Sequence, residues 1–100
     1  MTKKEKQQEY KLKSRYGITL KQYKVISKSQ KNCCAICNKP QSKLKKKLCV
    51  DHNHKTGFIR GLLCPYCNSK LLKYLRDDKE RAIGLLKYLE RAVYEDKDWI

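Results

Sequence analysis

The residues best suited to chemistry lie in one stretch, residues 48–68, which reads LCVDHNHKTGFIRGLLCPYCN. It contains the chain's only two histidines, an aspartate directly before the first of them, and a Cys-x-x-Cys pair. A second Cys-x-x-Cys pair, Cys34 and Cys37, lies upstream, and residues 38–63 separate the two pairs. These residue types and spacings are typical of a metal-stapled fold that carries a metal-dependent hydrolytic site.

The two Cys-x-x-Cys pairs predict a structural zinc site. Zinc in structural sites takes four tetrahedral N or S ligands, and each Cys-x-x-Cys turn supplies two thiolates. Because four thiolates leave no open position, we expect this zinc to hold the fold and take no part in the reaction. Cys33 and Cys49 are left over and are interpreted as free buried thiols, although Cys33 could replace Cys34. The four predicted ligands are Cys34, Cys37, Cys64 and Cys67.

A base and two oxygen ligands for a second metal lie in the same stretch. Phosphodiester hydrolysis requires that an attacking water lose a proton, and an imidazole that titrates near neutral pH can accept it. Carboxylate and amide oxygens suit Mg²⁺, which takes one or two protein ligands and otherwise keeps water and substrate phosphate. We predict His52 as the general base and Asp51 and Asn68 as the Mg²⁺ ligands, with Mn²⁺ able to substitute.

The polar residues around these three have supporting assignments. Asp51 and His52 are neighbours on an extended chain and should point to opposite faces, whereas His54 should return to the side of His52. Lys55 and Arg60 can contact phosphate. Alternatives remain for each: the histidines as zinc ligands in mixed Cys/His sites, the asparagine as an ordinary helix residue, and the arginine as a solvated strand residue.

The charge indicates the class of partner. Lys and Arg number 25 against 10 Asp and Glu, which gives a formal net charge of +15. This excess suits a polyanion, DNA or another nucleic acid first, and predicts an affinity that falls steeply with salt. An anionic membrane surface is the alternative, but no segment is apolar and long enough to span a bilayer. The lysines of one loop would contact phosphates without reading sequence, or else be solvated: Lys43, Lys45, Lys46 and Lys47.

The cysteines also indicate the compartment. No apolar segment follows the lysine-rich start of the chain, so we expect no secretory signal and an intracellular location. In a reducing compartment, paired Cys-x-x-Cys turns bind metal more often than they form disulfides.

One hundred residues allow one domain, and a domain of this size often needs a staple. We expect a small α+β fold. Residues 1–15 should form a basic arm or helix, either solvated or in contact with phosphate. Residues 19–75 should hold the zinc site, a hairpin with strands at 48–51 and 58–62, and a following helix from Pro65.

Helical patterns flank this core. Thr19 and Gln22 form a capping box after the stop signal Tyr16-Gly17, and the stripe of the helix that follows is assigned to the core: Leu20, Tyr23, Val25 and Ile26. A last helix is predicted over residues 78–95. Its stripe is broad enough that a homodimer contact is kept as a hypothesis: Ala82, Ile83, Leu85, Leu86, Leu89 and Val93.

Several of these motifs together resemble one family. Cys34-Ala-Ile-Cys37, Val50-Asp-His-Asn-His54, Gly57-Phe-Ile-Arg-Gly-Leu-Leu-Cys64 and Cys67-Asn68 are similar to the recombination endonuclease VII family, among the HNH or ββα-metal nucleases. The resemblance covers roughly residues 16–90. It implies a ββα-metal core flanked by N- and C-terminal helices, and an enzyme whose substrate is DNA. It implies the same base and metal ligands as above, with His54 as a supporting active-site residue, and a bacteriophage source, hence the cytoplasm of a bacterial host.

The resemblance has a boundary at the C-terminus. The family's junction-resolving member continues into a segment that supports dimerisation and branch recognition, whereas this sequence reads only to Ile100. We therefore expect a Mg²⁺-dependent endonuclease that nicks or cleaves DNA to 5′-phosphate and 3′-hydroxyl ends, with no small-molecule substrate. A noncatalytic zinc module that binds nucleic acid explains the charge and the cysteines but not Asp51, His52 and Asn68. A protein-interaction zinc module leaves the charge unexplained.

Overall fold

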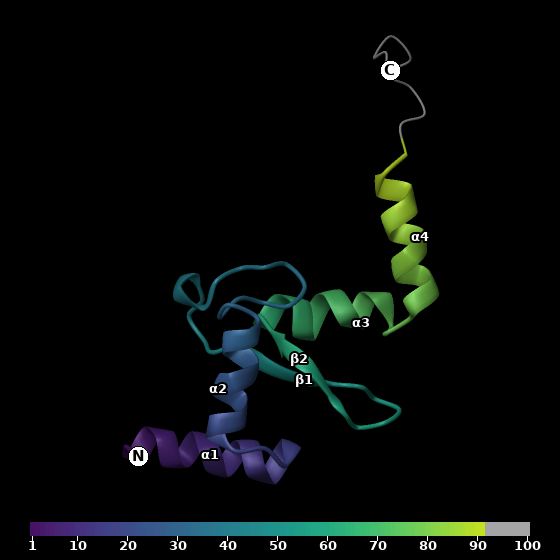
Figure 1. The fold of residues 1–100 in the computed structure, drawn as a ribbon. Coiled ribbons are helices and arrows are strands. Elements are labelled where there is room, and N and C mark those ends of the chain that lie inside the picture. Colours follow the sequence, from purple (N-terminus) through teal and green to yellow (C-terminus); the bar gives the residue numbers. More distant parts are fainter. Residues whose placement is uncertain (92–100) are drawn as a thin grey trace.

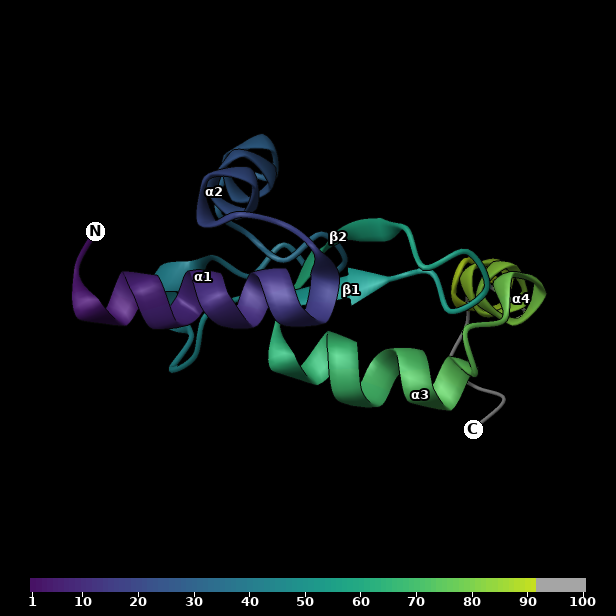
Figure 2. The same cartoon turned by 90° about the horizontal axis from the view of Figure 1, so that it is seen from below.

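The computed structural model describes residues 1–91 and has the small α+β fold expected from the sequence: four α-helices around one two-stranded antiparallel sheet (Figure 1). Figure 2 shows α2 and α3 on opposite sides of the hairpin. The elements in chain order are α1 (Lys3–Tyr16), α2 (Leu20–Ser29), β1 (Cys49–His52), β2 (Ile59–Leu63), α3 (Leu72–Leu75) and α4 (Lys79–Leu89).

The first two helices begin and end at the predicted signals. Thr19 Oγ1 accepts a hydrogen bond from the backbone N–H of Gln22 at 3.1 Å, and the Gln22 Oε1 atom accepts one from Thr19 N at 2.7 Å. This reciprocal pair is the expected capping box. Gly17 ends α1 with a φ of 70°, a left-handed conformation that glycine adopts without a Cβ penalty. The basic N-terminal segment is therefore helical.

The core lies where α1 and α2 pack against the hairpin. Tyr23 reaches it from α2, and its hydroxyl donates to the Leu48 carbonyl at 2.6 Å. Burial raises the pKa of Tyr23 to about 12. The predicted stripe was wrong at Val25, which is 62% exposed because it lies on the outer side of α2. The buried aliphatic side chains are Leu12, Leu20, Leu48, Val50, Leu62 and Leu63.

Each strand begins and ends one residue later than predicted. Leu48 stays outside the ladder because its N–H donates to the side chain of Gln41, in a 3₁₀ turn, η1 (Gln41–Lys43), at 2.8 Å. The ladder then pairs Cys49 with Leu63. At its other end Asn53 closes the hairpin loop, since its N–H donates to the Phe58 carbonyl at 2.7 Å.

A β-bulge interrupts the hairpin beside Asp51. Asp51 pairs with Gly61, but His52 pairs with Ile59, so Arg60 has no partner across the ladder. A regular antiparallel ladder would instead place Arg60 opposite His52. A bulge of this kind bends the strand and redirects its side chains.

The helix predicted from Pro65 to about Leu75 is present, but its middle is wider than an α-helix. Pro65 and Tyr66 are α-helical, and a π-helical turn, η2 (Cys67–Leu71), then leads into α3. The N–H of Leu72 donates to the carbonyl of Cys67, five residues back, which defines a π turn. Such turns occur frequently at functional sites. The predicted buried side of this helix is only half-buried: Leu71, Leu72 and Leu75.

The last helix extends away from the core. Asp78 caps α4 through hydrogen bonds from Glu80 N at 2.9 Å and Arg81 N at 3.3 Å. Helix is described as far as Leu89, and residues 92–95 of the prediction, Val93 included, lie outside the described residues. Its apolar stripe is solvent-exposed, from 38% at Ile83 to 71% at Leu89. No helix within residues 1–91 is long and apolar enough to cross a membrane.

One glutamine side chain ties α2 to the sheet. Gln30 Nε2 donates to the carbonyls of Leu62 and Cys33, each at 2.9 Å, and its Oε1 accepts from Leu62 N at 2.9 Å. A Cβ atom added to Gly61 would lie 2.9 Å from that Oε1 atom. Glycine at position 61 therefore leaves room for the Gln30 side chain, which three hydrogen bonds hold in place.

Two glycine-to-alanine substitutions should have opposite effects on the free energy of unfolding. Gly61→Ala should lower it by about 1–3 kcal/mol, because the new methyl group displaces the Gln30 amide. Gly84→Ala in α4, where nothing lies within 4 Å of an added Cβ, should raise it by up to about 1 kcal/mol through helix propensity. Urea unfolding of both variants measures this. A destabilisation of equal size in both would contradict the role given to Gln30.

Candidate active site and metal centre

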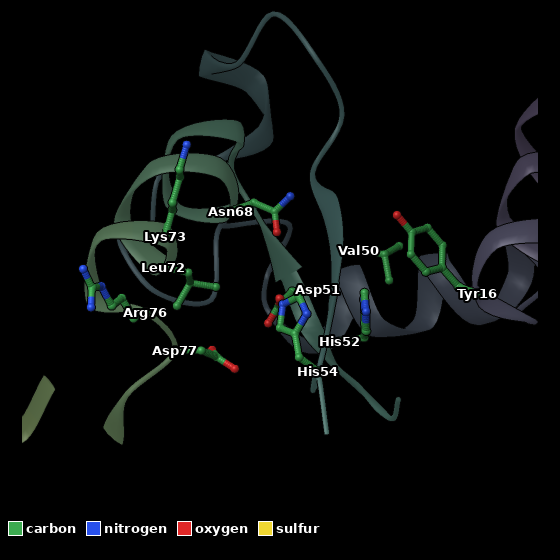
Figure 3. A pocket seen from close by; sticks show the side chains of 10 residues that line it. All are labelled: Tyr16, Val50, Asp51, His52, His54, Asn68, Leu72, Lys73, Arg76 and Asp77. Atoms are coloured by element: carbon green, nitrogen blue, oxygen red, sulfur yellow. The ribbon is translucent and has the colours of Figure 1, made fainter. Parts of the chain in front are cut away.

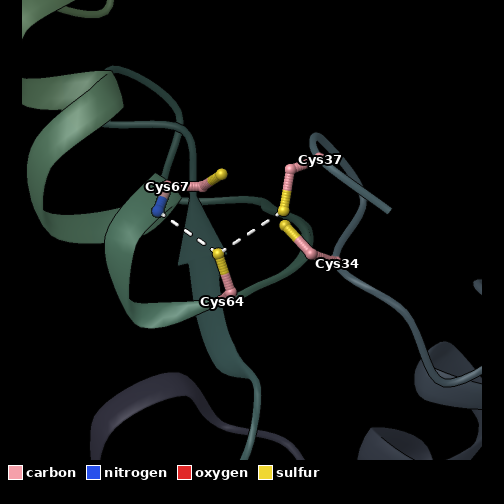
Figure 4. Close-up of side chains that lie close together, drawn as sticks. All are labelled: Cys34, Cys37, Cys64 and Cys67. Atoms are coloured by element: carbon pink, nitrogen blue, oxygen red, sulfur yellow. Dashed lines mark hydrogen bonds between the residues drawn. The ribbon is translucent and has the colours of Figure 1, made fainter. Parts of the chain in front are cut away.

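The four predicted zinc ligands gather in one cluster, in which the sulfur atoms all lie within 4.8 Å of one another (Figure 4). The Sγ atoms of Cys37 and Cys64 are 3.7 Å apart. Thiolates bound to zinc at about 2.3 Å in a tetrahedron would be roughly 3.8 Å apart, so the cluster is compatible with a structural zinc ion. Cys34 belongs to the cluster, as predicted, and Cys33 does not.

Backbone hydrogen bonds shape the first half of this cluster. The turn that carries Cys34 is closed by its N–H, which donates to the Lys39 carbonyl at 2.9 Å, and is tied to β2 by Ala35 N, which donates to the Leu62 carbonyl at 3.1 Å. Burial alone would raise the pKa of Cys34, but backbone hydrogen bonds to its sulfur outweigh burial and lower the pKa to about 6. Since a metal ligand has to be a thiolate, these bonds favour metal binding.

The second half of the cluster joins β2 to the helix after it. Cys64 follows β2, and the N–H of Cys67, at the start of η2, donates to the Cys64 sulfur at 3.4 Å. Within residues 1–91, neither histidine joins the cluster, so the mixed Cys/His alternative is not supported. Cys33 and Cys49 are free thiols, as predicted, but they are half-buried and not buried. Burial raises the pKa of Cys49.

All four predicted catalytic residues line one cleft of about 460 Å³ (Figure 3). The rings of His52 and His54 have centroids 4.9 Å apart, so the two histidines share a side as expected. In Figure 3, Tyr16 from α1 borders one side of the cleft and the helix that carries Asn68 borders the other. The full lining consists of Tyr16, Val50, Asp51, His52, His54, Asn68, Leu72, Lys73, Arg76 and Asp77.

The expectation that Asp51 and His52 face opposite ways was wrong, because both line this cleft. The lining takes in three consecutive residues of β1, Val50, Asp51 and His52, so it does not follow the alternation of the strand. The depths of the two residues differ. Asp51 is buried, with 7% of its surface exposed, whereas His52 is half-buried.

Arg60 was predicted to contact phosphate, but in this structure it binds two carboxylates. Its Nε donates to Asp51 Oδ2 at 2.7 Å and its Nη2 to Asp51 Oδ1 at 3.1 Å. Its Nη1 lies 2.9 Å from Asp77 Oδ1. The hydrogen bonds to Asp51, followed by those to Asp77, raise the pKa of Arg60 above its ordinary value. Arg60 is also absent from the lining of the cleft.

The donor set of the cleft fits a hard divalent cation. Arg60 uses one acceptor site on each Asp51 oxygen, and a carboxylate offers about four such sites, so a metal ion can still bind there. Figure 3 shows the Asn68 amide directed into the cleft. Among residues 1–91 no side chain or backbone group hydrogen-bonds this half-buried amide, so its oxygen can accept a metal ion. A carboxylate and an amide oxygen are suitable Mg²⁺ ligands.

Sequence reasoning did not assign six of the residues that line the cleft, among them Tyr16, Lys73 and Arg76. Tyr16 was interpreted only as part of a helix stop, but its ring centroid lies 6.2 Å from that of His52. Lys73 and Arg76 carry no local signal, because the periodic pattern of their helix consists of its leucines. The π turn between Asn68 and Lys73 is a feature of the structure, so the spacing of these two residues carries no signal in the sequence.

The other predicted phosphate contacts lie outside the cleft. Lys55 is exposed in the hairpin loop, where its N–H donates to Asn53 Oδ1 at 2.8 Å. Lys47 Nζ donates to Gln8 of α1 at 2.5 Å, which joins the basic loop to that helix. The remaining lysines of the loop are exposed: Lys43, Lys45 and Lys46.

Comparison with known proteins agrees with the motifs of the cleft and the cluster. The family model for recombination endonuclease VII matches residues 9–91. The chain belongs to the recombination endonuclease VII family. This match covers both cysteine pairs, the hairpin and the cleft.

Two curated relatives are phage proteins. The chain is 43% identical to the Gene 59 protein of Mycobacterium phage D29 over 76 residues, which cover 76% of this chain and 46% of the relative. It is 46% identical to the Gene 59 protein of Mycobacterium phage L5 over 74 residues, which cover 74% of this chain and 44% of the relative. The chain thus spans less than half the length of these relatives. No solved structure matches it significantly.

Loss of one cluster cysteine should disrupt the whole fold. We expect the purified protein to carry about one zinc per chain, and Cys64→Ala to lose both the zinc and cooperative unfolding, because structural zinc contributes about 10–16 kcal/mol in zinc-finger peptides. Elemental analysis and thermal unfolding measure the two effects. Cys49→Ala, which removes a half-buried thiol outside the cluster, is the matched control and should keep its zinc. A folded, reduced protein without zinc would contradict the assignment.

Proposed function

We propose that the protein is a Mg²⁺-dependent HNH endonuclease that hydrolyses DNA phosphodiester bonds, by nicking or by cleaving, with branched DNA among its potential substrates. The products would carry 5′-phosphate and 3′-hydroxyl ends. The observation that supports this most directly is that His52, Asp51 and Asn68 line one cleft in a chain of the recombination endonuclease VII family. The net charge of +15 supports DNA as the partner.

In this proposal each residue of the cleft has a separate task. His52 accepts the proton of the attacking water through its imidazole. Asp51 and Asn68 hold the divalent metal ion, which neutralises charge on the phosphate and on the leaving oxygen. His54, stacked at a tilt against His52, supports the orientation of that ring.

Cations around the cleft would hold the DNA. Lys73 and Arg76 line the cleft and are the nearest candidates for phosphates beside the cleaved bond. Lys55 and the basic loop would contact the backbone farther away, without reading sequence. The four-cysteine cluster would bind zinc and hold the helix that carries Asn68 against the hairpin.

Two further features of the proposal concern the surroundings of the enzyme. The exposed stripe of α4 is suited to a homodimer contact, since side chains such as Leu86 and Leu89 are uncovered in residues 1–91. The phage relatives support an action in the cytoplasm of a bacterial host. The alternative function is a zinc module that binds nucleic acid without cutting it. This alternative does not explain the polar cleft or the Asn68 amide directed into it.

Substitutions in the cleft should separate proton transfer from metal binding. His52→Ala should abolish cleavage of supercoiled plasmid in Mg²⁺, because general base catalysis contributes about 10²–10⁴-fold, while zinc content and DNA affinity stay unchanged. Asn68→Ala should lose activity through weaker metal binding and recover part of it at high Mg²⁺ or Mn²⁺ concentration. His52→Ala should not recover, because metal cannot replace the lost base.

The control for this series is Lys28→Ala in α2, an exposed residue that lies outside the cleft. It should cut plasmid at the wild-type rate. Cleavage by His52→Ala at the rate of the control would refute the assigned base. Tight DNA binding without any cleavage by the wild-type protein would favour the noncatalytic module.

A further inference from the structure

We propose that Arg60 is a positioning residue that fixes the direction of the Asp51 carboxylate, and so sets the affinity of the cleft for its divalent metal ion. This inference rests on the proposed function of the cleft. Arg60 has two connections, one to the predicted metal ligand and one to Asp77 at the turn before α4. Arg60 therefore acts through Asp51, without touching substrate.

The β-bulge brings Arg60 to Asp51. In an uninterrupted ladder, Arg60 would pair with His52, and its side chain would point away from the face that Asp51 occupies. The register shift between Asp51 and His52 leaves Arg60 as the extra residue of β2 and allows its guanidinium to approach both Asp51 oxygens. Bulges are often found next to active sites, where they redirect one side chain.

The geometry of the pair determines the orientation of the carboxylate. Two parallel N–H···O bonds, at 2.7 and 3.1 Å, engage both Asp51 oxygens at once, which fixes the carboxylate plane as well as its position. Arg60 is also the only partner of that carboxylate among residues 1–91. Because Asp51 is 7% exposed, water cannot readily take over this task. A lysine ammonium would supply the charge but not the planar fork.

The guanidinium is itself held at its other end. Its Nη1 lies 2.9 Å from Asp77 Oδ1, which leaves little freedom for the fork to rotate. Asp77 stands in a sharp turn in which Arg76 and Asp77 both have positive φ, at 55° and 53°. The N–H of Asp77 donates to the Leu72 carbonyl at 3.2 Å, which anchors the turn to α3. The side-chain contacts of Arg60 with Asp51 and Asp77 thus link the predicted metal ligand to a tightly held turn.

A direct role of Arg60 in holding DNA fits the structure less well. Arg60 lines neither the wall nor the floor of the cleft, whereas Lys73 and Arg76 do. All three of its side-chain nitrogens are within bonding distance of carboxylate oxygens. Three of its five N–H donors are thus engaged, which leaves a phosphate only one donor on each terminal nitrogen.

The test compares Arg60→Lys with the wild-type protein by titrating Mn²⁺ into zinc-loaded protein without DNA, with binding followed by calorimetry. Arg60→Lys keeps the charge and removes the fork, and should weaken Mn²⁺ binding by about 10–100-fold, as loss of a group that orients a metal ligand typically does. The Mg²⁺ concentration for half-maximal cleavage should rise in parallel, while DNA affinity stays unchanged. The control Lys28→Gln removes an exposed charge outside the cleft and should bind Mn²⁺ as tightly as wild type.

Asp77→Asn provides a second, milder variant, because it weakens the outer anchor and leaves the pair with Asp51 intact. It should lower the Mn²⁺ affinity several-fold, but less than Asn68→Ala does, and this result stands if Arg60→Lys fails to fold. Because Asp77 also lines the cleft, a loss as large as that of Asn68→Ala would instead make Asp77 a metal ligand and overturn its anchoring role. Equal Mn²⁺ affinity in wild type and in the folded variants would overturn the positioning role while leaving the proposed function standing. A wild-type protein that binds no Mn²⁺ would overturn both. A variant that lost DNA affinity with normal Mn²⁺ binding would instead assign Arg60 to phosphate.

Discussion

The four-cysteine cluster is the constraint on which the rest of the structure depends. It joins the turn after α2, the end of β2 and the start of the helix that leads into α3. The apolar core is small and lies mainly between α1, α2 and the hairpin, so burial alone holds the helix after β2 only weakly. Cys67 directly precedes Asn68 in η2. The cluster that fastens this helix therefore also sets the position of a predicted Mg²⁺ ligand.

A second constraint, the β-bulge of the hairpin, acts on the opposite wall of the cleft. Asp51 and His52 both line the cleft, and the β-bulge turns Arg60 onto the Asp51 carboxylate. The two walls then present complementary groups, a histidine and a carboxylate from the hairpin and an amide from the helix. Each wall is held in a different way, by the four-cysteine cluster with its predicted zinc on one side and by a bidentate ion pair on the other. This arrangement is suited to a hydrolytic site, which needs its groups held before substrate arrives.

Much of this could be predicted from the sequence, because the signals were local. Capping residues, the Cys-x-x-Cys spacing and the motif around His52 each depend on a few neighbouring residues. The errors have a common origin in nonlocal pairing. The bulge depends on the register between two strands, and so the partner of Arg60 could not be predicted from alternation. Tyr16 and Lys73 were missed because their place in the cleft follows from how α1 and α3 pack.

The most direct test of the account is a crystal structure of zinc-loaded protein soaked with Mn²⁺, with anomalous data collected at the zinc and manganese edges. The account predicts a zinc peak within the four-cysteine cluster and a separate manganese peak bound by Asp51 and Asn68, with the Arg60 fork still on Asp51 and the His52 ring unbound. A zinc peak bound by the histidines, or manganese absent from the cleft at saturating concentration, would contradict it.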